Sequence, residues 1–245
     1  LFVALPKVAP ERLLEIQDAC RSLGIACHHV PLFSSGHFRR MQLTFIGDIP
    51  ILAERAMRTT IVYRTAKRAL DVGVAGVLLV GLSPVFLLIA LLIKLTSRGP
   101  VVFTQERIGQ HGQPFPMHKF RTMRTDAPSY ANKPTARDPS IFPLGRVLRR
   151  SSLDELPQLV NVLKGEMSLV GPRPDMPQIV SAYTPIQRER LLVPPGMTGL
   201  WQVSADRQFP IHENIDYDLY YVYNRSFLLD FAILVRTMFR LGGGH

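Results

Sequence analysis

The longest apolar run in the chain extends from Val72 to Ile93 and contains 22 residues without a charged side chain. About 20 apolar residues are enough for a helix to cross a bilayer. Ser83-Pro84 interrupts the run near its middle, where a proline removes a backbone hydrogen bond and bends a helix. The pattern therefore predicts a broken apolar helix within residues 63–100.

Three arrangements of this broken helix fit the pattern. A re-entrant helix would enter the membrane, break at Ser83-Pro84 and return, and the Ser83 hydroxyl could bond the carbonyl that the proline leaves free. A kinked single span is the second arrangement, and a buried helix of a soluble core is the third. We favour the re-entrant helix because basic residues flank both ends about equally, which suits two cytoplasmic ends. A soluble core would have to bury the 22 uncharged residues on every side.

The pattern before this run is that of one strand–helix–strand unit. Residues 1–5 and 25–32 are apolar enough for strands, and a helix is expected to begin at Pro10 and end before Gly24. Residues 1–33 are therefore predicted as one βαβ-like unit, either the end of a larger α/β domain or a packing module; they are too few for a Rossmann sheet and lack its glycine-rich turn. In residues 34–62 the apolar positions follow no clear helix or strand period, and this segment is predicted as a linker.

After residue 100 the pattern predicts short strands, turns and helices. Residues 101–109 should form a strand that leads into a Gly-Gln-His-Gly turn. Ser152 and Glu155 have the spacing of a capping box, which predicts a helix that starts there and is ended by Gly165. Residues 101–245 are predicted to be the domain that carries the chemistry.

Composition and charge narrow the classes of function. The chain has 245 residues, of which 47% are hydrophobic, and 29 Lys and Arg against 19 Asp and Glu give a net charge of +10. A protein this basic is expected to bind phosphates or anionic lipid. A nucleic-acid binder would space its basic residues along one helix face or among stacking aromatics, whereas these arginines accompany carboxylates and Gly-Pro turns. We therefore expect no nucleic-acid partner.

Two enzyme classes are also disfavoured. A membrane metallohydrolase would need a cluster of His and Asp ligands, and the seven histidines are scattered. A polytopic transferase would need many apolar spans, and the sequence has one such run.

Two groups of charged residues are candidates for chemistry. Lys119 and Arg121 are two residues apart, so an extended segment would place them on one face; the pair suits a phosphate, although a solvated face is the plainer interpretation. Asp154 and Glu155 follow several arginines, including Arg149. A carboxylate at a helix N-terminus beside guanidinium groups is expected to stay ionised, as a nucleophile or a Mg²⁺ ligand must. Capping and chemistry are compatible if Glu155 caps the helix while Asp154 points outward.

Four long motifs then occur in order: KFRTM at 119–123, RSSLDELPQL at 150–159, MSLVGPRP at 167–174 and PGMTGLWQVS at 195–204. In these motifs residues 63–245 resemble the bacterial polyprenyl-phosphate sugar-1-phosphate transferases. These monotopic phosphoglycosyl transferases begin exopolysaccharide and O-antigen synthesis. Residues 1–62 resemble the end of the soluble Rossmann-like module that precedes the catalytic domain in larger members, so a longer polypeptide is expected.

The resemblance implies an α+β, largely helical monotopic membrane domain, with a re-entrant helix broken at Ser83-Pro84, at the cytoplasmic face of the bacterial inner membrane. Its lipid partner is the bilayer, and a homodimer is left open. The sugar also stays open, because Pro194-Pro195-Gly196 and Ser204-Ala205-Asp206-Arg207 stand where the family commonly has Arg-Pro-Gly and Ser-Gly-Arg.

The resemblance also implies a two-step reaction. A carboxylate attacks the β-phosphate of a UDP-sugar and expels UMP, and polyprenyl (undecaprenyl) phosphate then takes the phosphosugar from the enzyme. The nucleophile maps to Asp154 and its partner to Glu155, with Mg²⁺ expected at this pair. Further residues are expected to bind the phosphates and the nucleotide; they are Lys119, Arg121, Arg149 and Arg173.

Overall fold

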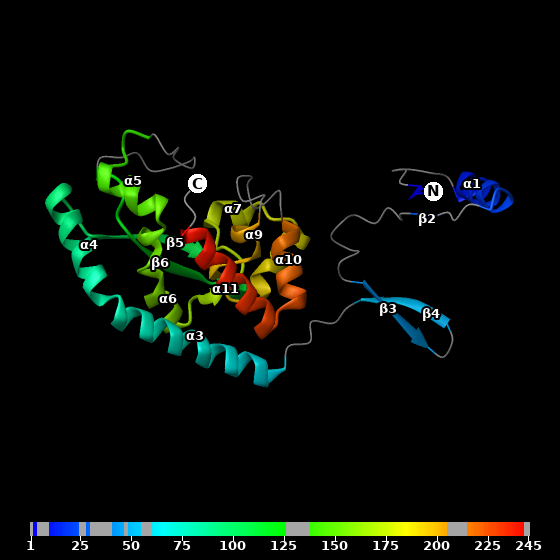
Figure 1. Cartoon of the computed structure of the whole chain (residues 1–245), viewed down its shortest axis with the longest axis horizontal. Helices are drawn as coiled ribbons and strands as arrows, with labels where there is room; N and C mark the ends of the chain where they lie inside the picture. Colours follow the sequence, from blue (N-terminus) through cyan, green and yellow to red (C-terminus); the bar gives the residue numbers. More distant parts are fainter. Residues whose placement is uncertain are drawn as a thin grey trace. The chain divides into compact units, whose positions relative to one another are not determined.

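The structure is a computed structural model of the chain, and it describes residues 2–3, 10–24, 28–29, 41–46, 49–54, 60–125, 138–204 and 215–242. The chain divides into two compact units, Leu1–Ala56 and Met57–His245. Figure 1 labels their helices and strands.

The first unit begins with a strand–helix–strand order. β1 (Phe2–Val3) pairs in parallel with β2 (His28–His29), and α1 (Pro10–Ser22) lies between them in the sequence. The helix starts at the predicted proline and ends before Gly24, which has a φ of 68°. The rest of both predicted strands lies outside the described residues, and two paired residues do not make a Rossmann sheet. The Rossmann-like assignment stays a prediction.

The segment predicted as a linker contains regular structure. β3 (Met41–Ile46) and β4 (Ile49–Glu54) form an antiparallel hairpin in which Met41 pairs with Glu54 and Ile46 with Ile49. Apolar and polar residues alternate through most of β3, which is the two-residue period of a strand. The expectation of an irregular connection over this part of residues 34–62 was therefore wrong.

The apolar run forms two helices, α3 (Ile61–Gly81) and α4 (Ser83–Thr96), which meet at Leu82 with a bend of 60°. Among the described helices, none is by itself long and apolar enough to cross a membrane, whereas this bent pair meets the requirement of length and composition when taken together. The predicted break is confirmed; insertion into a membrane as a re-entrant helix stays a prediction.

The hydrogen bond expected at the break is present. The Ser83 hydroxyl donates to the Val80 carbonyl oxygen at 2.7 Å. Val80 precedes Pro84 by four residues, so its carbonyl is the one that an amide at Pro84 would have bonded in a continuous helix. The serine therefore replaces part of the bonding that the proline removes.

The second unit continues with the antiparallel hairpin of β5 (Val102–Ile108) and β6 (Pro114–Phe120). The strand predicted over residues 101–109 is confirmed as β5. Short helices and the parallel pair β7–β8 follow. Their bounds are α5 (Pro143–Arg150), η2 (Leu153–Glu155), α6 (Gln158–Lys164), β7 (Ser168–Val170), α7 (Pro177–Ser181), α8 (Pro185–Arg188), η3 (Glu189–Leu192), β8 (Gly196–Thr198), α9 (Leu200–Val203), α10 (Ile215–Asn224) and α11 (Phe227–Gly242).

The bend gives the two helices separate packing partners. One buried cluster joins α3 to α6, β7 and α11 and includes Ala75, Val162 and Ile233. The other joins α4 to β6 and α5 and includes Ile93 and Phe120. Because α4 turns away from α3 at Leu82, α5 and the end of β6 pack against α4 (Figure 1). This packing fixes the position of η2, which follows α5.

Charged residues in the first half of α3 also bind other elements of the second unit. Asp71 is buried and accepts hydrogen bonds from the Ser168 hydroxyl at 2.7 Å and the Leu169 amide at 3.2 Å. Arg68 donates to two carbonyls at the end of α6, at 2.5 and 2.7 Å. The first half of the bent pair is therefore held by polar bonds as well as by its apolar face.

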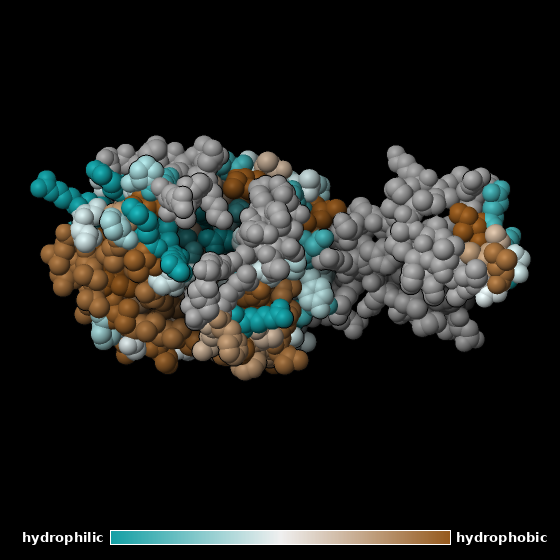
Figure 2. Space-filling view, turned by 45° about the horizontal axis from the view of Figure 1, so that its top comes forward, coloured by the Kyte–Doolittle hydropathy of each residue, from teal (hydrophilic) through white to brown (hydrophobic). Residues whose placement is uncertain are grey.

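A hydrophobic face of the bent pair stays exposed. Leu87, Leu88, Leu91 and Leu95 of α4 are each more than half exposed, and this face is the brown area at the left of Figure 2. Exposed apolar patches of this kind mark interaction or membrane surfaces.

Candidate active site

Three of the residues singled out in the sequence meet at one carboxylate. Lys119 lies near the end of β6, and its Nζ is 2.7 Å from Oε1 of Glu155. Arg173, in the loop after β7, places Nη2 3.2 Å from the same oxygen. Prolines on both sides of Arg173 restrict its backbone. Glu155 therefore joins the strand hairpin to the Pro-Arg-Pro loop.

The capping box predicted at Ser152 and Glu155 is not formed. Ser152 has a left-handed conformation with a φ of 57° and makes no capping hydrogen bond. The Glu155 side chain is instead held by the two cations, and α6 starts only at Gln158. The predicted end of that helix is confirmed, because Gly165 closes it with a φ of 89°.

Burial separates the two neighbouring carboxyl groups. Asp154 is only 8% exposed, so the expectation that it points outward was wrong. Burial and then the Glu155 carboxylate raise the pKa of Asp154 to about 6, against the attraction of Lys119, Arg149 and Arg173. Burial also raises the pKa of Glu155, but the attraction of Lys119 and Arg173 outweighs it and lowers the pKa to about 2. Glu155 is therefore held ionised well below neutral pH, whereas Asp154 gains its charge only as the pH rises past about 6.

Arg149 lies next to this pair and is fixed to the end of β6. Its Nε donates to the Thr122 hydroxyl at 2.9 Å. The two segments can approach this closely because Gly145 lies against Thr122, where an added Cβ would be 2.1 Å from the Thr122 carbonyl oxygen. Arg149 is thus near enough to lower the pKa of Asp154, although its hydrogen bond goes to Thr122 and not to either carboxylate.

Arg121 does not join the cluster. It is 5% exposed, and its guanidinium donates to the carbonyls of Ser97 at 2.8 Å and Arg98 at 2.5 Å, just after α4. The prediction that Lys119 and Arg121 form one phosphate-binding face is corrected: β6 ends at Phe120, so the alternation of a strand does not extend to Arg121. Its role here is to hold the chain after α4.

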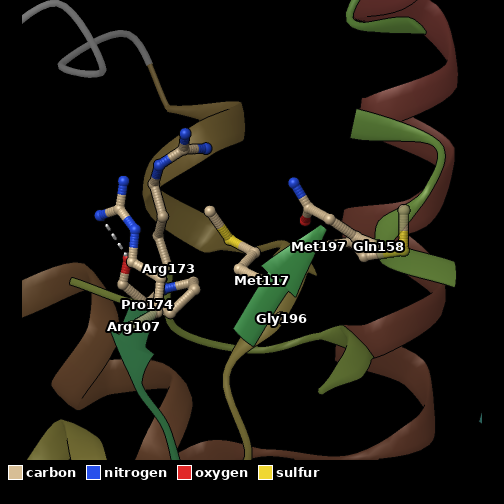
Figure 3. Close-up of a pocket in the computed structure, with 7 residues that line it drawn as sticks. All are labelled: Arg107, Met117, Gln158, Arg173, Pro174, Gly196 and Met197. Atoms are coloured by element: carbon tan, nitrogen blue, oxygen red, sulfur yellow. Dashed lines mark hydrogen bonds between the residues drawn. The ribbon is translucent and has the colours of Figure 1, made fainter. Parts of the chain in front are cut away.

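A small hollow lies beside Arg173, and Figure 3 shows the residues around it. Met117, Met197 and Gln158 line it together with Arg173 and one residue that the sequence did not single out, Arg107. Arg107 comes from β5, and its side chain runs alongside that of Arg173 in Figure 3. Strand alternation predicts which face of β5 carries Arg107, but no local signal says that this face meets the Pro-Arg-Pro loop.

Cations outnumber carboxylates around the dyad. Lys119, Arg149 and Arg173 act on Asp154, and Arg173, Asp175 and Glu155 act on Arg107. Four cations against these three carboxylates give about +1 when all three are ionised, which favours an anionic ligand. Fixed cations of this kind bind phosphate groups and stabilise the charge that develops in phosphoryl transfer.

Asp154 and Glu155 could supply some, but not all, of the ligands of a divalent cation. The described residues contain no group of three or more His, Cys, Asp and Glu side chains that could hold a metal ion. Among those residues, none donates a hydrogen bond to Asp154, and the ion pairs of Glu155 use a single oxygen. Because Mg²⁺ is commonly held by one or two carboxylates together with substrate phosphates, this donor set fits such an ion.

Lysine should not replace either arginine near the dyad. Arg149→Lys would lose the Nε bond to Thr122, and Arg173→Lys would lose a planar donor that reaches Glu155 and leaves further N–H groups free. We expect each variant to lower turnover by about tenfold or more, equivalent to about 1.4 kcal/mol, without unfolding. Initial rates together with thermal unfolding test this, and wild-type rates in both variants would assign the two arginines to the solvated surface.

The residues that form this site lie in a part of the chain that is similar in sequence to known proteins. The sequence model of the bacterial sugar transferase family matches residues 62–243. The exopolysaccharide production protein ExoY of Sinorhizobium fredii is 38% identical over 189 residues, which cover 71% of this chain and 84% of that protein. Undecaprenyl-phosphate galactose phosphotransferase of Salmonella typhimurium is 37% identical over 240 residues, 89% of this chain and 48% of that protein.

A third relative is the UDP-glucose:undecaprenyl-phosphate glucose-1-phosphate transferase of Escherichia coli. It is 38% identical over 208 residues, which cover 81% of this chain and 45% of that protein. The chain thus spans most of ExoY and about half of the two longer relatives.

Proposed function

This chain belongs to the bacterial sugar transferase family, and from that premise we propose that it transfers a sugar-1-phosphate from a UDP-sugar to polyprenyl (undecaprenyl) phosphate and releases UMP. The names of the Salmonella and Escherichia relatives support the substrates. The reaction would be the first membrane step of exopolysaccharide or O-antigen synthesis.

One observation carries the proposed mechanism: two adjacent carboxyl groups in different electrostatic states. Glu155 is ionised and paired with Lys119 and Arg173. Asp154 is buried beside it without a donor among the described residues and has a raised pKa. A carboxylate that lacks stabilising hydrogen bonds is the more reactive of the two, so we assign the nucleophile to Asp154 and an electrostatic positioning role to Glu155.

In the first half-reaction a carboxylate oxygen of Asp154 attacks the β-phosphorus. A bond forms between that oxygen and phosphorus, and the bond from phosphorus to the bridging oxygen breaks. The electron pair leaves with UMP, and the phosphosugar stays on Asp154 as an acyl phosphate. Arg149 and Arg173 would neutralise the phosphoryl oxygens during the transfer.

In the second half-reaction a phosphate oxygen of polyprenyl phosphate attacks the same phosphorus. The acyl-phosphate bond breaks, the Asp154 carboxylate is regenerated, and a polyprenyl diphosphate sugar is released. Because the soluble donor and the membrane acceptor react in turn, they need not occupy the site together.

We also propose that Asp154 and Glu155, together with the donor's phosphates, would hold Mg²⁺ at this site. When bound, it would neutralise diphosphate oxygens and favour the departure of UMP. Removal of divalent cations with a chelator should therefore stop turnover, and added Mg²⁺ should restore it.

The membrane assignment rests on the bent pair α3–α4 and on the exposed leucines of α4. We place the chain at the cytoplasmic face of the bacterial inner membrane, with α3–α4 re-entrant in the bilayer. This location brings the dyad within reach of a lipid-linked acceptor.

Single cysteines at Ala66 and Ser97, in a background with Cys20 and Cys27 replaced by serine, should both be labelled only from the cytoplasmic side. Pro84→Leu should favour a full span, because a straight helix of 22 residues is about 33 Å long. Periplasmic labelling at one of the two positions in the otherwise unchanged protein would establish a transmembrane helix and refute the re-entrant arrangement.

The activity itself is tested by UMP release from a panel of UDP-sugars, with and without polyprenyl phosphate. A single substrate in the panel would also identify the sugar. Of the segments that differ from the family, Gly196 lines the hollow beside Arg173, and residues 205–207 lie outside the described part of the chain. Absence of UMP release from every member of the panel would refute the proposed donor.

A further inference from the structure

Backbone contacts hold Arg107 beside Arg173. The Ile108 amide donates to the Asp175 carbonyl at 2.9 Å, and Nη1 of Arg107 donates to the Pro174 carbonyl at 3.3 Å. The end of β5 is therefore attached to the loop that carries Arg173, and both guanidinium groups extend in the same direction from it (Figure 3).

A buried ion-pair cluster fixes that loop from its other side. Arg190 is 3% exposed, donates to the Arg173 carbonyl at 2.6 Å and pairs with Asp218 at 2.6 Å and with Asp175. Because the Arg173 backbone is held in this way, the two arginines cannot readily move apart. Glu155 and Asp175 offset part of the repulsion between the two guanidinium groups, and a bound anion would offset more of it.

Arg107 is incompletely satisfied within the protein. Its Nη2 donates to Gln105 at 2.7 Å, whereas its buried Nε has no hydrogen-bond acceptor among the described residues. Burial and then the nearby Arg173 lower the pKa of Arg107 to about 10. Within the described residues Arg107 therefore keeps one N–H group without an acceptor, as Arg121 and Arg190 also do, but Arg107 is the one of the three that lines the hollow.

We propose that Arg107 binds the α-phosphate of the donor, the phosphate that departs as UMP, alongside Arg173. This inference rests on the proposed function and adds a leaving-group residue to it. Arg173 contacts the dyad through Glu155, whereas Arg107 contacts the loop beyond it, at Pro174. In an in-line transfer the leaving oxygen lies opposite the nucleophile, so with the β-phosphate at Asp154 the α-phosphate falls toward Arg107.

A purely positioning role for Arg107 makes a different prediction. If Arg107 served only to hold Pro174, its loss would disturb the whole hollow and weaken every ligand there. If it binds the phosphate, its loss should weaken only ligands that carry that phosphate. UMP and uridine differ by this group, so the ratio of their affinities separates the two roles.

The experiment measures UMP and uridine binding by calorimetry to the full chain without a donor. Compared with the unchanged protein, Arg107→Gln should weaken UMP binding by about tenfold or more and leave uridine binding within about twofold. Arg107→Lys should have a UMP affinity between those of the unchanged protein and Arg107→Gln. Lysine keeps the positive charge but lacks the planar pair of N–H donors of the guanidinium. Arg188→Gln, an exposed arginine at the end of α8, is the matched control and should change neither affinity.

Three results would count against the inference. An unchanged UMP-to-uridine ratio in Arg107→Gln would remove Arg107 from the phosphate site while the proposed function stands. An equal loss of both affinities would assign it to positioning. Failure of the unchanged protein to bind UMP would refute the proposed function and this inference together.

Discussion

Replacement of Asp154 by asparagine is expected to abolish UMP release and capture of the phosphosugar, while the protein stays folded. The amide keeps the volume of the side chain but lacks the attacking anion, so turnover should fall at least about a thousandfold, roughly 4 kcal/mol of barrier. A donor labelled in its β-phosphate, quenched with acid during turnover, should leave label on a peptide that contains Asp154 in the unchanged protein only.

The same variant should not lower the melting temperature. The pKa of Asp154 is raised to about 6 in the folded state, above the value of about 3.9 for an unfolded chain. Ionisation of this group therefore costs stability at neutral pH, and a neutral amide avoids that cost. Asp18→Asn, at an exposed carboxylate of α1, is the control and should retain turnover. Retained turnover in Asp154→Asn, without trapped label in the unchanged protein, would rule out the covalent mechanism.

Replacement of Glu155 by glutamine should have the opposite effect on stability. The carboxylate accepts from Lys119 at 2.7 Å and Arg173 at 3.2 Å and is about a quarter exposed. The pKa of Glu155 is about 2 in the folded protein, against about 4.3 in an unfolded chain. Its negative charge therefore stabilises the fold at pH values above about 4.3, and this contribution is lost as the pH falls toward 2. Glu155→Gln leaves two cations uncompensated, so we expect a loss of about 2 kcal/mol in the free energy of unfolding.

Turnover should also fall, by about a hundredfold, roughly 2.7 kcal/mol, because Lys119 and Arg173 lose the group that positions them. Denaturant unfolding and initial rates measure the two effects, and Glu106→Gln on the exposed face of β5 is the control. If Glu155→Gln kept both activity and stability, Glu155 would serve neither as an ion-pair partner nor as a metal ligand, and a neutral acceptor would suffice at this position.

Several elements followed from local sequence because local physics determines them. Proline at residue 84 breaks a helix wherever the helix lies, and the Ser83 hydroxyl reaches the freed carbonyl of the preceding turn. Gly165 ends α6 with a positive φ that other residues rarely adopt. The strand predicted over residues 101–109 also formed, as β5 before the turn at residues 109–112.

The ionic states at the dyad depended on the tertiary structure. Sequence placed Asp154 and Glu155 side by side, but their pKa values move in opposite directions because one is buried without donors and the other meets Lys119 and Arg173 from distant segments. Local spacing favoured a capping box instead, since Ser152 and Glu155 match that pattern. The attraction of two cations is stronger than one capping bond, and the cap did not form.

The sequence by itself determined the family, through four motifs in order, and the break in the apolar helix. Only the tertiary structure decided which cations surround the dyad: Arg121, beside Lys119 in the sequence, turns to the carbonyls after α4, whereas Arg107, far from Arg173, lies next to it. The physical reason is that packing of α4 against α5 and attachment of β5 to the loop at Pro174 bring distant residues together. Such contacts depend on the whole fold, and spacing along the chain does not encode them locally.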